Sequence, residues 1–420
     1  MLDAAPSVRN PLLLLSYGQS NAEAHVAGPR PSSPLLEDRR VVALASGMGL
    51  RGHLYGADGA RRSRRGDFYR DGRRLEEHQV GSVHPLSDHN IENSSILHAA
   101  GSVLVGGNLF EKVYVRAAAR GGMRLVGRPS PKNRISGIFR LSDGEISPLF
   151  EDLLNSAEDL VQIGAQSGEG MTRCYILFIH GEADRSTKFE DYWADFLDMK
   201  RRVDAHLAGL GLDVHWLVTQ SAGTDHNFGG NDWEVRKGAI HPDVRSVPNL
   251  TFLGPLYPYA LDDFIHHDAE AKALIGELAA TAIREIDRGR PWNGPMPQDW
   301  GLLDARSACI TVSSDTPLVI DTRHPYDHFG FSLAPRIRNR IVAVDLAGPR
   351  QIRIRFEADI AKPIEIDYAF RHRFPDTQVT ARPMAFGGGQ IREAWGEDSV
   401  LLPGKTLHKW LPGFRITVGP

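Results

Sequence analysis

The sequence predicts an α/β domain with a parallel sheet, followed by a smaller all-β domain of the sandwich type. Over residues 1–290, short apolar runs that end in Gly or polar residues alternate with amphipathic stretches, as expected for buried parallel strands beneath helices. A segment rich in Gly and Pro then interrupts this pattern. Beyond it, strand-like runs follow one another between turns without a helical period. We therefore expect an α/β domain at 1–290, a linker at 291–301 and an all-β domain at 302–420.

The first domain contains the stronger secondary-structure patterns. Its apolar runs predict strands at residues 12–16, 113–117, 174–179, 214–219 and 250–253. Amphipathic stretches predict helices at residues 94–105, 147–163, 189–207 and 269–286. The last helix carries two adjacent apolar stripes, formed by Leu274, Leu278 and Ala282 and by Ile275, Ala279 and Ile283. We expect both stripes to face the sheet.

Turn-forming residues define the linker and the strands of the second domain. The helical pattern is interrupted by Gly289, Pro291, Gly294, Pro295 and Pro297. Strands are then predicted at residues 310–312, 318–320, 341–346, 352–356, 364–368 and 414–418. No convincing helix separates these runs, which favours a sandwich.

Composition places the chain among soluble globular proteins. Hydrophobic residues make up 41% and charged residues 24% of the 420 residues, and no apolar run is long enough to span a bilayer. The net charge of -3 gives no global reason to expect nucleic acid or a membrane as a partner. Residues 1–10 lack the pattern of a secretory signal, so a cytoplasmic, virion-associated or otherwise exported protein is expected. The widely spaced Cys174 and Cys309 argue against a disulfide framework.

A serine directly follows the first predicted strand. Residues 18–21 read Gly-Gln-Ser-Asn, and open α/β sheets place ligands just beyond the carboxyl ends of their strands. Ser20 is therefore a candidate nucleophile. The alternative is that Ser20 or Asn21 only caps the next helix.

A serine hydroxyl is a weak nucleophile at neutral pH and needs a base that a third group orients. Asp263 and His266 can supply this pair, because the carboxylate can hold one imidazole nitrogen while the other takes the Ser20 proton. The neighbouring Asp262 and His267 leave the choice of pair open. A surface Asp and His at a helix start is the alternative.

Several blocks together resemble the SGNH hydrolases, in the branch of sialate O-acetylesterases and acetylxylan-type carbohydrate esterases. Residues 18–21 and 263–266 resemble the first and last motif blocks of that family. Residues 118–122 (Ala-Ala-Arg-Gly-Gly) resemble its oxyanion turn, and residues 179–184 (Ile-His-Gly-Glu-Ala-Asp) resemble its Gln-Gly-Glu-x-Asp segment. Residues 233–237 resemble the helix between the third and last blocks.

The resemblance implies a three-layer flavodoxin-like domain that hydrolyses an ester, commonly an O-acetyl group on a sugar, without metal or organic cofactor. Ser20 would attack the acyl carbon, His266 would act as base and then as acid, and Asp263 would orient His266. The backbone N–H groups of Ser20 and Gly122 would bind the oxyanion, with Gly121 as the alternative donor. Gln19, Asn21 and Glu182 would support these groups.

One residue departs from the family pattern. Where the family carries Gln or Asn as a further oxyanion donor, this chain has His180. An imidazole N–H can also donate to an oxyanion, provided that its tautomer is the right one. A purely structural role at a strand end is the alternative.

Three other groups of residues could contribute to binding. The arginine-rich stretch 51–74 is either a solvated loop or a site for an acidic polysaccharide. Trp395, Trp410 and Phe414 either fill the sandwich core or hold sugar rings. The spacing of His84, Asp88 and His89 matches no zinc pattern, so no metal is expected.

Three functional classes follow from these observations. The leading one is a carbohydrate O-acetylesterase that forms an acyl-Ser20 intermediate on an acetylated carbohydrate. A lipid or thioester hydrolase with the same triad is the second. The third is a carbohydrate-binding module that has kept the fold without the activity. The sequence makes no prediction of the oligomeric state.

Overall fold

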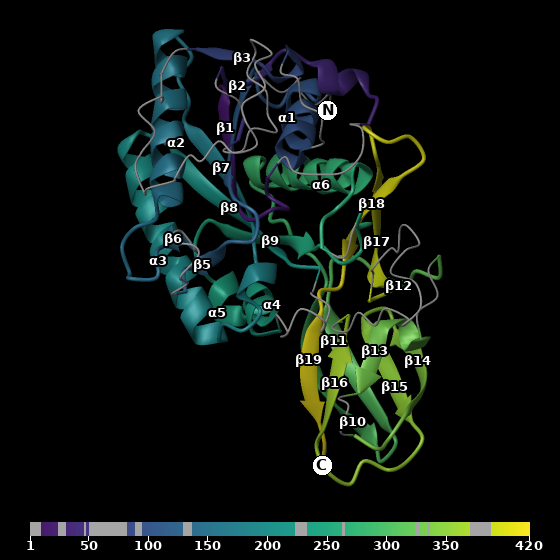
Figure 1. Cartoon of the computed structure of the whole chain (residues 1–420). Helices are drawn as coiled ribbons and strands as arrows, with labels where there is room; N and C mark the ends of the chain where they lie inside the picture. The colour runs from purple at the N-terminus through teal and green to yellow at the C-terminus, as the bar shows by residue number, and fades with distance from the viewer. Residues whose placement is uncertain are drawn as a thin grey trace.

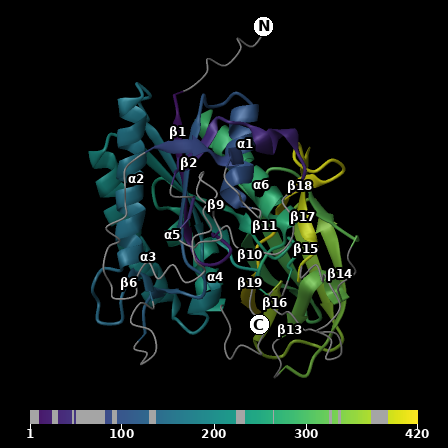
Figure 2. The ribbon, with the colours of Figure 1, turned by 45° about the horizontal axis from the view of Figure 1, so that its top comes forward.

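The structure, a computed structural model, describes most of the chain (Figures 1 and 2). The described residues are 10–23, 31–45, 48–49, 82–88, 95–128, 137–222, 233–262, 265–323, 327–333, 337–369 and 388–420. The N-terminal region is built on a seven-stranded sheet in the order β3-β2-β4-β1-β7-β8-β9. Its strands are parallel except β3, which runs antiparallel to β2 at one edge.

The elements of the N-terminal region include those predicted and several short ones that were not. The strands of the large sheet are β1 (Leu12–Gly18), β2 (Val41–Leu44), β3 (Val83–Pro85), β4 (Val113–Ala119), β7 (Arg173–Ile179), β8 (Asp213–Gln220) and β9 (Leu250–Pro255). A separate parallel pair is formed by β5 (Arg124–Val126) and β6 (Gly137–Arg140). The helices are α1 (Ile96–Gly106), α2 (Pro148–Gln166), α3 (Phe189–Gly209), α4 (Trp233–Ile240), α5 (Pro242–Arg245) and α6 (Ala269–Asp287), with short 3₁₀ turns η1 (Pro34–Glu37), η2 (Leu86–Asp88) and η3 (Glu182–Asp184).

The sheet lies between two layers of helices, as Figure 1 shows. Successive side chains of β1 point to opposite faces. Leu12 and Leu14 belong to the apolar cluster that includes α1 and α6. Leu13 and Leu15 belong to the cluster that includes α2 and α3. Every residue of β1 is buried, so its unbroken apolar run reflects burial on both faces of the sheet. The predicted fold class, an α/β region with a mostly parallel sheet, is confirmed.

The strand order brings several loops to one end of the sheet. β1 lies between β4 and β7, and its last residue, Gly18, pairs with Ala119 on one side and Ile179 on the other. The segments that follow these three strands therefore leave the sheet at the same carboxyl edge. This is the edge at which open α/β sheets bind their ligands.

The C-terminal region contains several small antiparallel sheets, as expected for an all-β part. Their orders are β10-β11-β15-β14, β13-β16-β19 and β12-β17-β18. The strands are β10 (Met296–Asp304), β11 (Ser307–Ser313), β12 (Leu318–Ile320), β13 (Phe331–Leu333), β14 (Ile341–Gly348), β15 (Gln351–Phe356), β16 (Ile364–Tyr368), β17 (Ile391–Asp398), β18 (Thr406–Trp410) and β19 (Phe414–Val418), with a 3₁₀ turn η5 (Asp327–Gly330).

The expected linker, 291–301, needs a correction. Its second half belongs to strand β10, which pairs with β11 at the edge of the four-stranded sheet. An edge strand tolerates a proline, and the pairing shifts register just after Pro297. Most side chains of β10 are exposed, so this strand lacks the apolar run that marks the others. The division into domains at these boundaries stays a prediction.

The C-terminal region packs directly against the α6 side of the N-terminal region (Figures 1 and 2). The Gln220 side chain exchanges two hydrogen bonds with the backbone of Gly413, at 2.7 and 2.9 Å. In α6, the Arg284 guanidinium pairs with Glu397 at 2.7 Å. One apolar cluster also runs through both regions. No helix in the described part of the chain is long and apolar enough to cross a membrane.

Candidate active site

The turn after β1 places a buried serine, Ser20, at the carboxyl edge of the sheet. Gly18 has a φ of 146°, and a Cβ at this position would lie 2.0 Å from the Ile179 carbonyl oxygen, so only glycine fits. The chain then folds back on itself, because Ala22 and Glu23 donate their N–H groups to the Gln19 carbonyl at 2.8 and 3.1 Å. We call residues 19–23 the nucleophile turn.

A histidine from the other end of the N-terminal region meets this turn. The His266 Nε2 atom lies 2.9 Å from the Ser20 Oγ atom, although the two residues are 246 positions apart in sequence. At this distance the hydroxyl can donate its hydrogen to a neutral imidazole. His266 belongs to the loop between β9 and α6, which is closed by the hydrogen bond from the Asp262 N–H to the His266 carbonyl at 2.8 Å. The structure thus places a candidate base on the candidate nucleophile.

His266 and His267 differ in where their rings lie. The His267 ring is fully buried, and its Nδ1 donates to the Ala260 carbonyl at 3.2 Å. Burial lowers the pKa of His267 to about 4. His267 is therefore a structural residue of the loop. Asp263, the predicted partner of His266, lies outside the described residues, so its role stays a prediction.

Asn21 connects the nucleophile turn to the loop between β9 and α6 that carries His266, which we call the histidine loop. Its Oδ1 accepts the His267 N–H at 3.2 Å, and its Nδ2 donates to the Ile265 carbonyl at 3.0 Å. The same Nδ2 also lies 3.3 Å from Glu182 Oε1. The amide thus holds the backbone on both sides of His266. A residue that only capped the next helix would not make these contacts with residues 265 and 267, so Asn21 has more than a capping role.

Glu182 and Gln19 hold the turn from the β7 side. Glu182 is buried at the start of η3, and its second oxygen accepts a hydrogen bond from the Gln19 side-chain amide. In return, the Gln19 Oε1 accepts the Ala183 N–H at 3.2 Å. The supporting positions predicted for Gln19, Asn21 and Glu182 therefore form one polar network around Ser20.

The candidate backbone oxyanion donors lie on two turns, Ser20 on the nucleophile turn and Gly121 and Gly122 on the turn after β4. Gly122 is exposed with a φ of 73°. In the part of the chain that the structure describes, neither the Ser20 N–H nor the Gly122 N–H donates to a protein acceptor. The Gly121 N–H, by contrast, donates to the Glu23 carboxylate. Of the two glycines, Gly122 is therefore the one whose N–H is free for an oxyanion.

The expectation that His180 donates to the oxyanion is corrected by its contacts. Its Nε2 lies 3.1 Å from the Met123 carbonyl oxygen, which can only accept, so this nitrogen carries the hydrogen. Its Nδ1 then accepts from the Tyr192 hydroxyl at 2.9 Å. The ring is buried between Phe178 and Tyr192, and burial lowers the pKa of His180. Both nitrogens are occupied in the core, which leaves no N–H for Ser20 chemistry.

Acid is expected to destabilise the fold through His267. Because the folded pKa is about 4 and an unfolded histidine titrates near ~6.5, the unfolded chain binds the proton first as pH falls. The free energy of unfolding should therefore drop between these values, by about 2 kcal/mol from pH 7 to pH 5. Urea unfolding at both pH values measures it. His215, whose pKa burial also lowers to about 4, adds a change in the same direction, and equal stability at pH 7 and 5 would contradict both.

The other predicted binding groups are placed as follows. The arginine-rich stretch 51–74, like His89, lies outside the described residues. Asp88 forms an ion pair with Arg39 at 2.6 Å. Among the residues that the structure describes, no group of three His, Cys, Asp or Glu side chains could hold a metal ion. The Phe414 ring stacks in the core on Tyr368.

Trp395 and Trp410 lie where the C-terminal region meets α6. Trp395 packs edge-on against Trp292, with Lys409 over both rings at 5.3 and 4.4 Å. Trp410 lines a cavity of about 410 Å³ that Tyr259, from the start of the histidine loop, also lines. Trp410 and Tyr259 are therefore aromatic residues that lie open to a cavity beside this loop.

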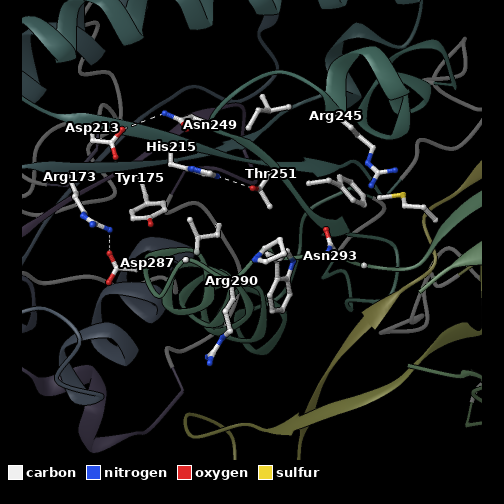
Figure 3. Close-up of a pocket in the computed structure, with 18 residues that line it drawn as sticks. Arg173, Tyr175, Asp213, His215, Arg245, Asn249, Thr251, Asp287, Arg290 and Asn293 are labelled. Carbon is white, nitrogen blue, oxygen red and sulfur yellow. Dashed lines mark hydrogen bonds and ion pairs between the residues drawn. The ribbon is translucent and has the colours of Figure 1, made fainter. Parts of the chain in front are cut away.

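A larger cavity lies at the opposite edge of the sheet. It measures about 640 Å³ and is lined by residues at the amino ends of β7, β8 and β9 and by the segment after α6. Figure 3 shows the Arg173–Asp287 ion pair and the His215–Thr251 hydrogen bond in its wall. None of the residues around Ser20 lines this cavity, so it is distinct from the candidate active site.

Sequence reasoning missed two buried charged residues, Glu23 at the end of the nucleophile turn and Lys272, which contacts it. Glu23 lies two positions after the Gly-Gln-Ser-Asn block. Lys272 lies in α6, three positions before Ile275 of a predicted apolar stripe. A lysine on a buried helix face is the signal that could have identified it.

Comparison with solved structures shows the fold. The chain is similar to a carbohydrate acetylesterase from Xanthomonas citri, with 13% sequence identity, a TM-score of 0.54, and coverage of 96% of this chain and 80% of that chain. Weaker matches are a protein from Arabidopsis thaliana (16% identity, TM-score 0.40, 65% and 97% covered) and NanS (14% identity, TM-score 0.44, 68% and 100% covered). No family model and no curated protein matches the sequence.

The match to the Xanthomonas citri protein extends over nearly the whole chain, so it includes the C-terminal region as well as the large sheet. The fold that the resemblance to carbohydrate esterases implies is thus confirmed.

Proposed function

We propose that the chain is a serine esterase that removes O-acetyl groups from a carbohydrate. The observation that carries the proposal is the 2.9 Å contact between the Ser20 hydroxyl and the His266 imidazole, at the edge of the sheet where ligands bind. The Asn21 and Glu182 network holds this pair in place. The substrate class rests on the carbohydrate acetylesterase whose fold this chain shares.

The reaction proceeds in two halves. The Ser20 Oγ attacks the acetyl carbonyl carbon while His266 Nε2 takes the hydroxyl proton, and the N–H groups of Ser20 and Gly122 bind the resulting oxyanion. The carbon–oxygen bond to the sugar then breaks, and His266 returns the proton to the sugar oxygen. Water attacks the acetyl-Ser20 ester with His266 again as base, which releases acetate and restores the hydroxyl. Asp263 orients His266 in this scheme.

Substrate preference tests the proposal. Turnover of p-nitrophenyl acetate, an acetylated polysaccharide and a long-chain p-nitrophenyl ester is compared, with Ser20→Ala as the blank. We expect the two acetyl esters to be hydrolysed and the long-chain ester to be a poor substrate. Preference for the long chain would move the assignment to a lipid or thioester hydrolase. Binding of the polysaccharide without turnover of any ester would indicate a carbohydrate-binding module.

Asn21→Ala is expected to lower kcat more than it changes KM. The substitution removes the amide that holds the backbone on both sides of His266, and a misplacement of about 1 Å can cost ~10²-fold in rate. We therefore expect kcat to fall by roughly 10–100-fold in steady-state kinetics with p-nitrophenyl acetate.

Asn339→Ala is the matched control. The Asn339 side chain also bridges backbone groups, donating to the Ala358 carbonyl at 2.7 Å and accepting the Ala358 N–H at 3.0 Å, but in the C-terminal region. Equal kcat values for the Asn21 and Asn339 variants would show that the Asn21 contact does not position the base.

A further inference from the structure

A buried glutamate links the nucleophile turn to the turn after β4, residues 120–122, which we call the oxyanion turn. Glu23 is the last residue of the nucleophile turn, and its residue surface is 6% exposed. Its backbone N–H donates to the Gln19 carbonyl at 3.1 Å, and its carboxylate accepts the N–H of Gly121. One residue thus contacts both the segment that carries Ser20 and the segment that carries Gly122.

A buried lysine holds this glutamate from α6. Lys272 is fully buried, and its Nζ donates to the backbone carbonyl of Glu23 at 3.2 Å. Burial lowers the pKa of Lys272 to about 7, and the Glu23 carboxylate opposes part of that shift. Both the ammonium and the amine form of the side chain can donate this hydrogen bond. Placing a lysine here costs desolvation energy, which a residue with a purely apolar packing role would avoid.

Two hydrogen bonds hold the oxyanion turn in place. Among the described residues, a Cβ placed on Gly122 would meet no atom within 4 Å, so this side of Gly122 is open. The turn is held by the Arg120 N–H, which donates to the Gly18 carbonyl at 3.2 Å, and by the Gly121 N–H on Glu23. The second bond occupies the Gly121 N–H and leaves the next N–H, that of Gly122, for a ligand.

We propose that Glu23, anchored by Lys272, is a positioning residue that orients the Gly122 N–H toward the oxyanion formed at Ser20. This role rests on the proposed esterase function. The Glu23 carboxylate accepts the Gly121 N–H and does not itself bind the oxyanion. It acts through the backbone of Gly121, so an amide at position 23 should replace the carboxylate, whereas a methyl group should not.

Two substitutions of Glu23 test the proposal by kinetics. Losing one oxyanion donor costs roughly 10²–10³-fold in kcat, which sets the upper limit for Glu23→Ala. We expect Glu23→Ala to lower kcat for p-nitrophenyl acetate by roughly 10–100-fold with little change in KM, because ground-state binding is retained. Glu23→Gln should recover most of the loss, since its amide oxygen can still accept the Gly121 N–H. Lys272→Met should give a loss in the same direction that is smaller than that of Glu23→Ala.

Glu277 offers a matched control for burial. Its carboxylate is 2% exposed and accepts the Val400 N–H at 2.6 Å, but on the face of α6 that meets the C-terminal region. Glu277→Ala removes a comparable buried contact and should leave kcat unchanged even if it lowers the free energy of unfolding. If Glu277→Ala and Glu23→Ala lower kcat equally, the role of Glu23 is only structural and the proposal is wrong.

Hydrogen exchange of the backbone amides separates this proposal from the esterase function. We expect the Gly121 amide, measured by NMR of glycine-labelled protein, to exchange faster in Glu23→Ala than in the wild type and to regain protection in Glu23→Gln. Unchanged Gly121 exchange, or a kcat of Glu23→Ala within ~3-fold of an active wild type, would overturn the positioning role while the esterase function stands. A wild type that turns over no ester would overturn the esterase function and the catalytic role of Glu23 together, whatever the exchange result.

Discussion

Replacing Ser20 by alanine is expected to lower kcat for p-nitrophenyl acetate by roughly 10⁴–10⁶-fold. The variant removes the hydroxyl that lies 2.9 Å from His266 Nε2, and with it the acyl-enzyme route. The remaining rate comes from the oxyanion donors and from substrate binding. Stopped-flow or steady-state release of p-nitrophenol measures the change.

Ser156→Ala is the control for this substitution. The Ser156 hydroxyl is also buried, but it donates to the Asp152 carbonyl within α2, on the face of the sheet opposite α6. The Ser156 variant should keep wild-type kcat. If Ser20→Ala turned over acetylated carbohydrate at the wild-type rate, Ser20 would not be the nucleophile and the proposed mechanism would be wrong.

His266→Ala is expected to give a loss of similar size, and the double variant Ser20→Ala/His266→Ala should be no slower than either single variant. Residues that act as one unit give strongly non-additive losses, because the second substitution removes nothing that still functions. Independent roles would instead multiply the two losses.

His84→Ala is the control for the loss of an imidazole. His84 lies in β3, and its Nε2 lies 3.2 Å from the Ser82 hydroxyl oxygen. The His84 variant should keep wild-type kcat for p-nitrophenyl acetate. If the loss of kcat in the double variant equals the product of the two single losses, Ser20 and His266 do not act as one unit.

The fold could be predicted where buried elements have a recognisable pattern of apolar residues. The run Leu12–Leu15 is apolar at every position because both faces of β1 are covered by helices. Strand β10 could not be predicted, because most of its side chains are exposed and its formation depends on pairing with β11. Pro297 also made this segment resemble a linker, whereas an edge position tolerates it.

The candidate site could be predicted in part. The Gly-Gln-Ser-Asn block and His266 lie in short motifs with a recognisable order, and the structure places Ser20 and His266 together. The motif could not show which way the His180 ring turns, because that depends on Tyr192 of α3 and on Met123. Glu23 and Lys272 escaped prediction because neither belongs to a recognisable motif, and their contact forms only when α6 packs against the nucleophile turn.

Mass spectrometry after treatment with a serine-directed sulfonyl fluoride tests the central claim most directly. The reagent modifies a hydroxyl that a neighbouring base has activated. We expect one adduct, on Ser20, in the wild type, strongly slowed labelling in His266→Ala, and unchanged labelling in Ser156→Ala. An unmodified Ser20 in active protein, or labelling of Ser20 at the same rate with and without His266, would contradict the account.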